Sequence, residues 1–266
     1  MSYETIDLRK QDHVATITLN RPERLNAFNP AMYRDLSLAA TEVSNDDDTR
    51  VAILTGAGRA FSAGADFQQR FEAEVDSHRQ GTANVTEKLP TYPHGDTDLT
   101  SVRQPLIAAI NGYAIGVGFN FTLQCDIRLM ARSARIRLPF TSLGMTPEAF
   151  STYYLPRLIG LGKAFEIWFT SRWVEADEAL AIGLVNEVVD EDQLMPRAQE
   201  LAAQIATNAP TALMLTKRLG YLGMSNDINA AKHFEAFSQD YVYGRQDFKE
   251  AVSARAEKRS PKFTGE

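Results

Sequence analysis

The sequence predicts an α/β fold in which helices connect parallel strands, followed by a C-terminal region made only of helices. Three features of the 266-residue chain support this prediction. Residues 3–20 predict two strands, because apolar side chains alternate with threonines in the second half of the segment. A helical pattern and a buried apolar strand at 51–54 follow, and a strand, a helix and a strand at this spacing pair in parallel. From residue 196 onward only helical patterns remain.

The first helix is predicted to begin at Pro30 and to end near Ser44. Asn29 is a suitable N-cap, and a proline at the first helical position gives up only an N–H that the helix does not use. Met32 and Leu36 begin an apolar face that continues along this helix. The pattern is that of a helix that crosses between two strands of one sheet.

Two glycine-rich bends stand out in the first half of the chain. The segment 105–126, PLIAAINGYAIGVGFNFTLQCD, predicts a buried strand, a turn, a bend at 116–118 and a helix from about residue 119 to 125. A second bend of small residues is FSAGAD, at 61–66, again with a helix-like segment after it. Glycines at such bends let the backbone approach a ligand closely and aim free N–H groups at it. A polarised carbonyl oxygen suits such a site, whereas a phosphate loop would need a Gly-Lys-Ser/Thr sequence that is missing here.

The rest of the chain alternates short strands and helices. Residues 68–104 are polar and weakly patterned, which is typical of either a functional flap or a disordered segment. Strands are predicted at 127–131, 136–138 and 185–189, and helices from 143–150 onward, at 162–170 and at 176–181. The final helices are predicted at 196–207, 211–222, 227–242 and 246–258. We therefore divide the chain into a core at 1–195 and a C-terminal helical region at 196–266.

Composition excludes several classes of protein. Hydrophobic residues make up 44% of the chain and charged residues 23%, as in an ordinary globular protein. The net charge of −6 and a pI near 5.4 argue against a protein that binds nucleic acid or an anionic membrane. No stretch has transmembrane length and the N-terminus carries no apolar signal core, so we expect a cytoplasmic location. The single cysteine, Cys125, cannot form a disulfide framework, and the four histidines fit no metal or hydrolase motif.

Several motifs together are similar to those of the crotonase (enoyl-CoA hydratase/isomerase) superfamily. FSAGAD is followed some forty residues later by PLIAAINGYAIGVGFN and CDIRLMARSARI, and RPERLNAF, AIGLVNEVV and EKRSPKF match elsewhere, so the resemblance covers essentially the whole chain. The resemblance implies a crotonase-like spiral of strand-strand-helix units, followed by a helical C-terminal region that packs trimers. It also implies an acyl-CoA thioester as substrate and a homotrimer or a dimer of trimers as the assembly.

The resemblance assigns roles to particular residues. The backbone N–H groups of Ala65 and Val117 would form an oxyanion hole that stabilises the enolate of the thioester. Asp66 is expected to brace the start of the next helix rather than to act as a base. Contacts with the acyl-CoA are implied for Arg24, Ala27, Ala63, Gly64, Asp66, Gly116, Asn120 and Lys258. Coenzyme A would enter as part of the substrate, and we expect no separate cofactor and no metal.

The departures from the family pattern narrow the expected reaction. Enoyl-CoA hydratases of this family carry two catalytic glutamates, and the matching positions here are Asn120 and Phe140, neither of which can act as a carboxylate acid or base. By contrast, LGMTPEAFSTYYLP resembles the peroxisomal type of Δ3,Δ2-enoyl-CoA isomerase, in which one catalytic glutamate follows the proline of this segment. That residue is Glu148. The resemblance therefore implies an isomerase with Glu148 as its acid/base.

Two alternatives remain open at this stage. One is another reaction of the superfamily: hydration through a base other than the two usual glutamates, or hydrolysis or carbon–carbon cleavage of the thioester. The other belongs to a different class, namely a catalytically silent subunit that binds CoA or supports assembly.

Overall fold

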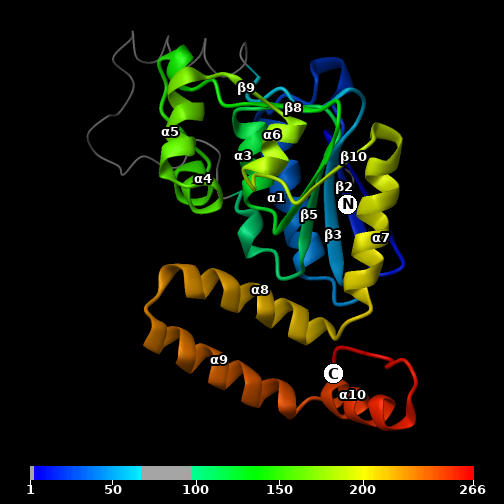
Figure 1. Cartoon of the computed structure of the whole chain (residues 1–266). Helices are drawn as coiled ribbons and strands as arrows, with labels where there is room; N and C mark the ends of the chain where they lie inside the picture. The colour runs from blue at the N-terminus through cyan, green and yellow to red at the C-terminus, as the bar shows by residue number, and fades with distance from the viewer. Residues whose placement is uncertain (1–2, 67–96) are drawn as a thin grey trace, which may run out of the picture.

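The computed structural model describes residues 3–66 and 97–266, and its largest element is a six-stranded sheet (Figure 1). The strands follow the order β1-β2-β3-β5-β7-β10. The strands β1 and β2 are antiparallel, and the four remaining neighbouring pairs are all parallel. They are β1 (Ile6–Gln11), β2 (Val14–Leu19), β3 (Val51–Gly56), β5 (Leu106–Ile110), β7 (Ile127–Ala131) and β10 (Glu187–Val189). Strands β3 and β5 are buried along their whole length, which explains why they are continuous apolar runs.

A second, four-stranded sheet has the order β4-β6-β8-β9. Its strands are β4 (Ala60–Ser62), β6 (Tyr113–Ile115), β8 (Arg135–Arg137) and β9 (Trp173–Glu175). Each pair of successive strands, β3 and β4, β5 and β6, β7 and β8, sends one strand to each sheet. This repeated unit is the expected spiral, and the predicted α/β fold class is confirmed.

Of the core helices, α1 (Pro30–Ser44) and α7 (Leu194–Ala206) pack on the larger sheet, whereas α4 (Ser151–Ile159) and α5 (Leu161–Thr170) lie off to one side (Figure 1). The helix α1 (Pro30–Ser44) begins as predicted, because the Asn29 side chain accepts a hydrogen bond from the Met32 N–H at 2.9 Å. The seven residues of α3 (Val117–Leu123) are all buried. The remaining helices of the core are α4 (Ser151–Ile159), α5 (Leu161–Thr170), α6 (Ala176–Ala181) and α7 (Leu194–Ala206), with short 3₁₀ turns η1 (Pro22–Arg24), η2 (Leu99–Ser101), η3 (Thr141–Leu143) and η4 (Glu191–Gln193).

One predicted helix start is wrong. The segment 143–150 was expected to begin a helix, but α4 begins only at Ser151. Ala149 and Phe150 have φ angles of 49° and 60°, which a right-handed helix does not accept. The three-residue strands β4, β6 and β9 were not predicted, because so short a run shows no periodicity. The helix-like segment expected after residue 66, and residues 68–96 of the expected flap, lie outside the described residues.

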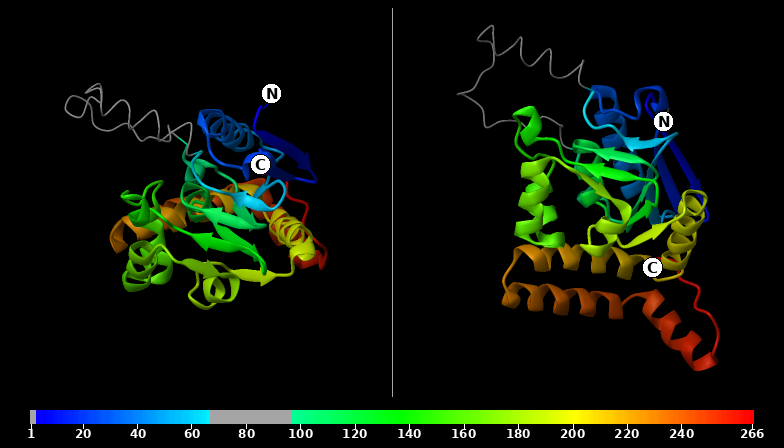
Figure 2. Two further views of the ribbon diagram at one scale, coloured as in Figure 1. Left: turned by 90° about the horizontal axis from the view of Figure 1, so that it is seen from above. Right: turned by 45° about the horizontal axis from the view of Figure 1, so that its top comes forward.

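The last helices form a layer of their own, which we call the helical layer: α8 (Pro210–Ser225), α9 (Ile228–Tyr243) and α10 (Gln246–Glu257). Figure 1 shows this layer beside one end of the core, and the turned view in Figure 2 shows α8 between the core and α9. The helix α7 instead packs on the larger sheet, and its Leu194, Ala198 and Ala202 belong to the main core. The division at residues 195 and 196 stays a prediction, but the separate layer begins one helix later, at α8.

Polar contacts tie the helical layer to the core. Lys217 of α8 pairs with Asp126 at 2.9 Å, and the Tyr221 hydroxyl donates to the other oxygen of this carboxylate at 2.8 Å. Burial, followed by the neighbouring Asp126 charge, raises the pKa of the Tyr221 hydroxyl. On the other side, Arg50 at the edge of β3 donates to the backbone oxygen of Phe263 at 2.7 Å. In the described parts of the chain, no helix combines the length and apolar character needed to cross a membrane.

Candidate active site

The two glycine-rich bends touch each other. A Cβ atom placed on Gly64 would lie 2.9 Å from the backbone oxygen of Ile115, and a Cβ atom on Gly118 would lie 2.5 Å from the Ser62 side chain. Real Cβ atoms do not approach so closely, so only glycine permits this contact. The glycines in FSAGAD and AIGVGF therefore serve to bring two backbone segments together.

Ala65 lies in the first bend and is fixed from both sides by Phe28. The Phe28 N–H donates to Gly64 O at 2.7 Å, and the Asp66 N–H donates to Phe28 O at 2.8 Å. Ala65 itself forms a parallel bridge with Phe28, in which its own N–H takes no part. Within residues 3–66 and 97–266, this N–H has no acceptor.

Val117 lies in the second bend, as the first residue of α3. The bend is held by the Gly116 N–H, which donates to Arg137 O at 2.9 Å, and the first hydrogen bond of the helix runs from Asn120 N–H to Gly116 O at 3.0 Å. The Val117 N–H therefore belongs to the N–H groups that a helix start leaves unused. Two such donors on touching bends, at Ala65 and Val117, are suited to stabilise a developing oxyanion.

The turn that carries Glu148 is attached to the same helix. The Asn120 Nδ2 donates to the Glu148 backbone oxygen at 2.9 Å, and Gln124, one turn later on α3, approaches Ala149 O at 3.5 Å. Two successive residues of this turn, Ala149 and Phe150, have positive φ, which is uncommon outside glycine and costs of order 1–3 kcal/mol each. Such conformations cluster at functional sites. One rigid helix thus connects the Val117 N–H to the backbone of Glu148.

Asn120 and Phe140 occupy the positions at which the family's hydratases carry glutamates. Asn120 is fully buried, and its amide nitrogen is engaged by the Glu148 backbone. Phe140 is 3% exposed and belongs to the hydrophobic core. Glu148 is the half-buried carboxylate next to this pair.

The loop between Arg21 and Phe28 supports the first bend, and two of its residues were missed in the sequence. Arg21 pairs with Asp66 at 3.2 Å and donates to Ala27 O at 2.6 Å, and both side chains of the ion pair are only 13% exposed. The amide nitrogen of buried Asn26 donates to the backbone oxygens of Ala57 and Ala60. The described contact of Asp66 is therefore with Arg21, and the helix start that it was expected to brace lies outside the described residues. The only signal for Arg21 in the sequence was its place at the start of RPERLNAF.

The residues expected to contact CoA fall into two separate groups. Arg24, Ala27 and Ala63 lie close together, since the Ala27 N–H donates to Arg24 O at 3.1 Å and the Ala63 N–H to Leu25 O at 2.8 Å. Arg24 is exposed there. Lys258 directly follows α10 in the helical layer, and α10 lies far from β8 and β9, whose sheet also contains β4 (Figure 1). A single chain therefore does not bring Lys258 to the other residues of the group.

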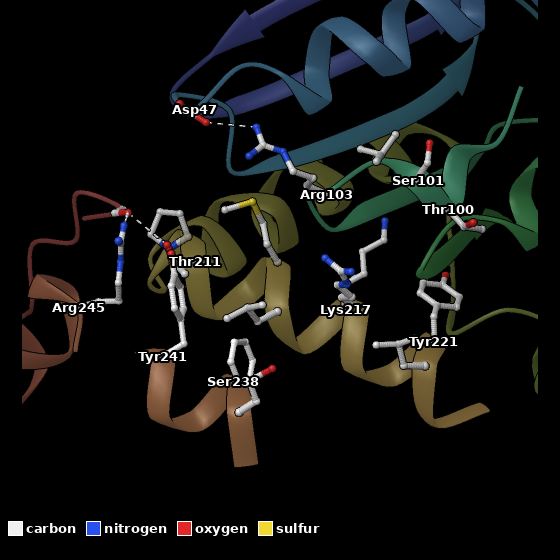
Figure 3. Close-up of a pocket in the computed structure, with 18 of the residues that line it drawn as sticks. Asp47, Thr100, Ser101, Arg103, Thr211, Lys217, Tyr221, Ser238, Tyr241 and Arg245 are labelled. Carbon is white, nitrogen blue, oxygen red and sulfur yellow. Dashed lines mark hydrogen bonds and ion pairs between the residues drawn. The ribbon is translucent and has the colours of Figure 1, made fainter. Parts of the chain in front are cut away.

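A cavity of about 1060 Å³ lies between the core and the helical layer (Figure 3). Neither Ala65, Val117 nor Glu148 lines it. Two of its cations are in ion pairs: Arg103 pairs with Asp47 at 3.2 Å, and Lys217 pairs with Asp126 as described above. The cavity is therefore a gap between two layers and not the candidate active site.

A second cavity, of about 970 Å³, lies on α8 and is lined in part by Cys125. The thiol is buried, and burial raises its pKa to about 12. A thiol with so high a pKa is a poor nucleophile. Among the described residues, no group of three or more metal-binding side chains occurs.

This fold, with backbone donors on two touching bends and one carboxylate nearby, agrees with the family to which the chain belongs. The model of the enoyl-CoA hydratase/isomerase family matches residues 9–266. The chain therefore belongs to the enoyl-CoA hydratase/isomerase family, the crotonase superfamily, and is an acyl-CoA enzyme of that family.

The proteins to which this chain is similar are named for more than one activity. The short-chain-enoyl-CoA hydratase of Clostridium acetobutylicum is 37% identical over 97% of both chains. The 1,2-epoxyphenylacetyl-CoA isomerase of Escherichia coli is 35% identical over 95% of both chains. The crystal structure of an enoyl-CoA hydratase from Bacillus anthracis superposes with a TM-score of 0.88 at 36% identity, covering 99% of this chain and 100% of that one. Membership in the family thus leaves the reaction itself open between hydration and isomerisation.

Proposed function

We propose that this protein is a Δ3,Δ2-enoyl-CoA isomerase in which Glu148 is the acid/base. The observation that carries the proposal is a hydrogen bond between Asn120 of α3 and the backbone oxygen of Glu148. It attaches the turn that contains Glu148 to the helix that begins at Val117. Asn120 and Phe140 stand where hydration would call for carboxylates, and neither can replace one. One positioned carboxylate is what a proton shift requires.

The reaction needs only a proton transfer next to a stabilised oxyanion. A 3-enoyl thioester has acidic protons on its α carbon once the thioester oxygen accepts hydrogen bonds from Ala65 and Val117. Glu148 removes one of these protons to give a dienolate and returns a proton to the γ carbon, which yields the conjugated 2-enoyl thioester. A positioned base contributes about 10²–10⁴ in rate, and each oxyanion donor about 10²–10³.

The proposal includes the binding of coenzyme A and the assembly. Arg24, Ala27, Ala63, Gly64, Asp66, Gly116, Asn120 and Lys258 are proposed to contact the acyl-CoA. Because Lys258 lies in the helical layer, its contact would come from a neighbouring subunit of a trimer or a dimer of trimers. Exposed apolar side chains on α9, such as Ile228 and Phe237, support such an assembly. No cofactor beyond the CoA of the substrate is proposed, and a cytoplasmic location stays a prediction.

The second candidate is hydration of a 2-enoyl-CoA with Glu148 as the only carboxylate. The names of the similar proteins favour it, because several of them are called hydratases. It requires that a water molecule be held next to Glu148 without the two usual glutamates. Hydrolysis or carbon–carbon cleavage of the thioester has no comparable support.

Product identification separates these candidates. The protein is incubated with a 3-enoyl-CoA and, in a second reaction, with a 2-enoyl-CoA, and the products are identified by chromatography and mass spectrometry. We expect conjugated 2-enoyl-CoA from the first and no 3-hydroxyacyl-CoA from the second. Rapid formation of 3-hydroxyacyl-CoA would overturn the isomerase proposal in favour of hydration. Binding of both thioesters without any turnover would indicate a catalytically silent subunit.

A further inference from the structure

Arg128 carries a buried positive charge that no carboxylate neutralises within the described part of the chain. The residue is only 5% exposed, and burial lowers the pKa of its guanidinium. The nearby carboxylate of Asp126 is engaged elsewhere, by Lys217 at 2.9 Å and by the Tyr221 hydroxyl at 2.8 Å. Buried charges in proteins are paired as a rule. The unpaired charge of Arg128 therefore indicates an anion that the chain itself does not supply.

Backbone oxygens hold the Arg128 guanidinium in place and leave one of its nitrogens free. Nε donates to Leu184 O at 2.9 Å, and Nη1 donates to Cys125 O at 2.8 Å. Nη2 has no acceptor among the described residues, yet it is not one of the polar atoms that are sealed from solvent. This nitrogen is therefore rigidly placed and accessible to an anion.

The space in front of Arg128 is the cavity of about 970 Å³ beside α8, since Arg128 is part of the wall of this cavity. The exposed side chain of Arg157 lines it too, stacked on Tyr153 and without an ion pair in the ranges 3–66 and 97–266. Lys217 and Asp126, the other charged residues described on the wall, neutralise each other. The cavity is therefore positive, although the whole chain has a net charge of −6.

The rest of the cavity wall is mainly apolar and comes from both the core and α8. Its large apolar side chains are Leu123, Ile127, Leu158, Ile205, Leu213 and Met224. The cavity volume is in the range of small-molecule sites. An apolar wall beside a positive charge suits a ligand with an alkyl chain and an anionic head. Because a single nitrogen of Arg128 is free, a carboxylate with one negative charge suits it better than a phosphate, which has more charge and more acceptor oxygens.

We propose that the cavity between α8 and the core binds a free fatty acid, with its carboxylate on Arg128 Nη2 and its alkyl chain along α8. Neither Ala65, Val117 nor Glu148 lines this cavity, so the site is separate from the candidate active site and goes beyond the proposed function. A thioester does not replace the acid, because the head of its acyl chain carries no charge. A fatty acid bound here contacts the core and α8 together and fastens the helical layer to the core.

Binding of three simple amphiphiles to the full-length protein tests the chemistry of the site. Dissociation constants are measured by titration calorimetry for decanoate, decanol and hexanoate. We expect decanoate to bind at least about tenfold more tightly than decanol, which cannot form the charge-assisted hydrogen bond. It should also bind at least about tenfold more tightly than hexanoate, whose shorter chain buries less apolar surface.

Two glycines of α8 provide a matched pair of variants. Gly220 lines the cavity, and a Cβ atom placed on it would meet no atom within 4 Å, so Gly220→Phe fills the space without a clash in the backbone. Gly223 has the same open surroundings on the same helix but does not line the cavity. Decanoate binding should be lost in Gly220→Phe and unchanged in Gly223→Phe.

The two arginines are tested separately. Arg128→Met should make decanoate bind no better than decanol. This variant also loses the bonds to backbone oxygens, and the glycine pair keeps the test valid if it does not fold. Arg157→Met changes an exposed side chain and should weaken decanoate about two- to fivefold while leaving decanol unchanged.

Each outcome bears on the fatty-acid site alone, because no turnover is measured. Loss of decanoate binding in Gly220→Phe with full binding in Gly223→Phe supports the site. Equal affinities of the wild-type protein for decanoate and decanol would overturn the role of Arg128 and the assignment of a fatty acid. Decanoate that binds both glycine variants equally well occupies another place, which also overturns the proposal. If decanoate does not bind and Gly220→Phe separates the assembly in sedimentation velocity, a second copy of the chain covers the cavity instead.

Discussion

Within a single chain, the two glycine-rich bends of the core are fully packed, whereas the helical layer is not. The bends are closed by contacts at which no Cβ atom would fit, and α3 is buried along its whole length. In the helical layer, α9 has no buried residue, and Ile228 and Phe237 are 83% and 75% exposed. One chain therefore holds the candidate active site in place by itself, whereas its last helices have an apolar surface left to cover. The kcat and the assembly should therefore respond to different substitutions, whereas KM for the acyl-CoA depends on assembly through the proposed contact of Lys258 from a neighbouring subunit.

The largest effect is expected at Glu148. Glu148→Gln keeps the size of the side chain but removes the base, so kcat for a 3-enoyl-CoA should fall about 10²–10⁴-fold. The rate is followed by the absorbance of the conjugated product. Glu191→Gln, an exposed carboxylate that contacts only Ser133 among the described residues, is the control and should retain full activity. A Glu148→Gln protein with most of its activity would show that another group is the base.

The second-largest effect is expected from a substitution that tests whether the contact between the two bends positions the oxyanion donors. In Gly64→Ala, the new Cβ atom would meet Ile115 O at 2.9 Å, and the backbone with φ of +92° resists an L side chain. If the shift costs one donor, kcat falls about 10²–10³-fold. Gly162→Ala in α5 has open space around its Cβ and should leave kcat unchanged. An unchanged kcat in Gly64→Ala would mean that the bend does not set the donor geometry.

A smaller effect is expected from the brace behind the first bend. Arg21→Met removes the ion pair with Asp66 and the bond to Ala27 O, which lets Ala65 move relative to Val117. A displacement well below 1 Å should lower kcat roughly tenfold and change KM less. Arg21→Lys should recover part of the loss. Arg9→Met removes an ion pair of an arginine that is 81% exposed and serves as the control. A loss confined to thermal stability, with normal kcat in the folded protein, would reduce Arg21 to a structural role.

Substitutions in the helical layer should have the smallest effect on kcat and the largest effect on assembly. Ile228→Ser combined with Phe237→Ser changes exposed side chains, so the free energy of unfolding of a single chain should change by no more than about 0.5 kcal/mol. Sedimentation velocity should nevertheless show a shift from the assembled form to single chains. Glu235→Ser on the same helix is the polar control. A double variant that sediments like the wild-type protein would remove α9 from the interface.

The predictions from the sequence succeeded where neighbouring residues decide the structure. The N-cap at Asn29, the long strands and the four last helices follow from short-range patterns, and each was found within a few residues of its expected place. The strands β4, β6 and β9 were missed, and the helix expected from 143 was placed too early. In the latter case, the positive φ of Ala149 and Phe150 depends on contacts of this turn with α3, which no local pattern encodes.

The sequence by itself determined the class of the protein: two glycine-rich bends, the order of strands and helices, and a single glutamate where the isomerase pattern has one. Only the tertiary structure decided how these parts meet. The pairing of β4 with β6 brings Gly64 against Ile115, and the packing of α3 against the turn before α4 binds Asn120 to the Glu148 backbone. It also buries Asn120 Oδ1 and Ser151 Oγ without a hydrogen-bond partner among the described residues. Such contacts join residues far apart in the chain, and they arise from the register of strands and the burial of side chains rather than from local conformational preference.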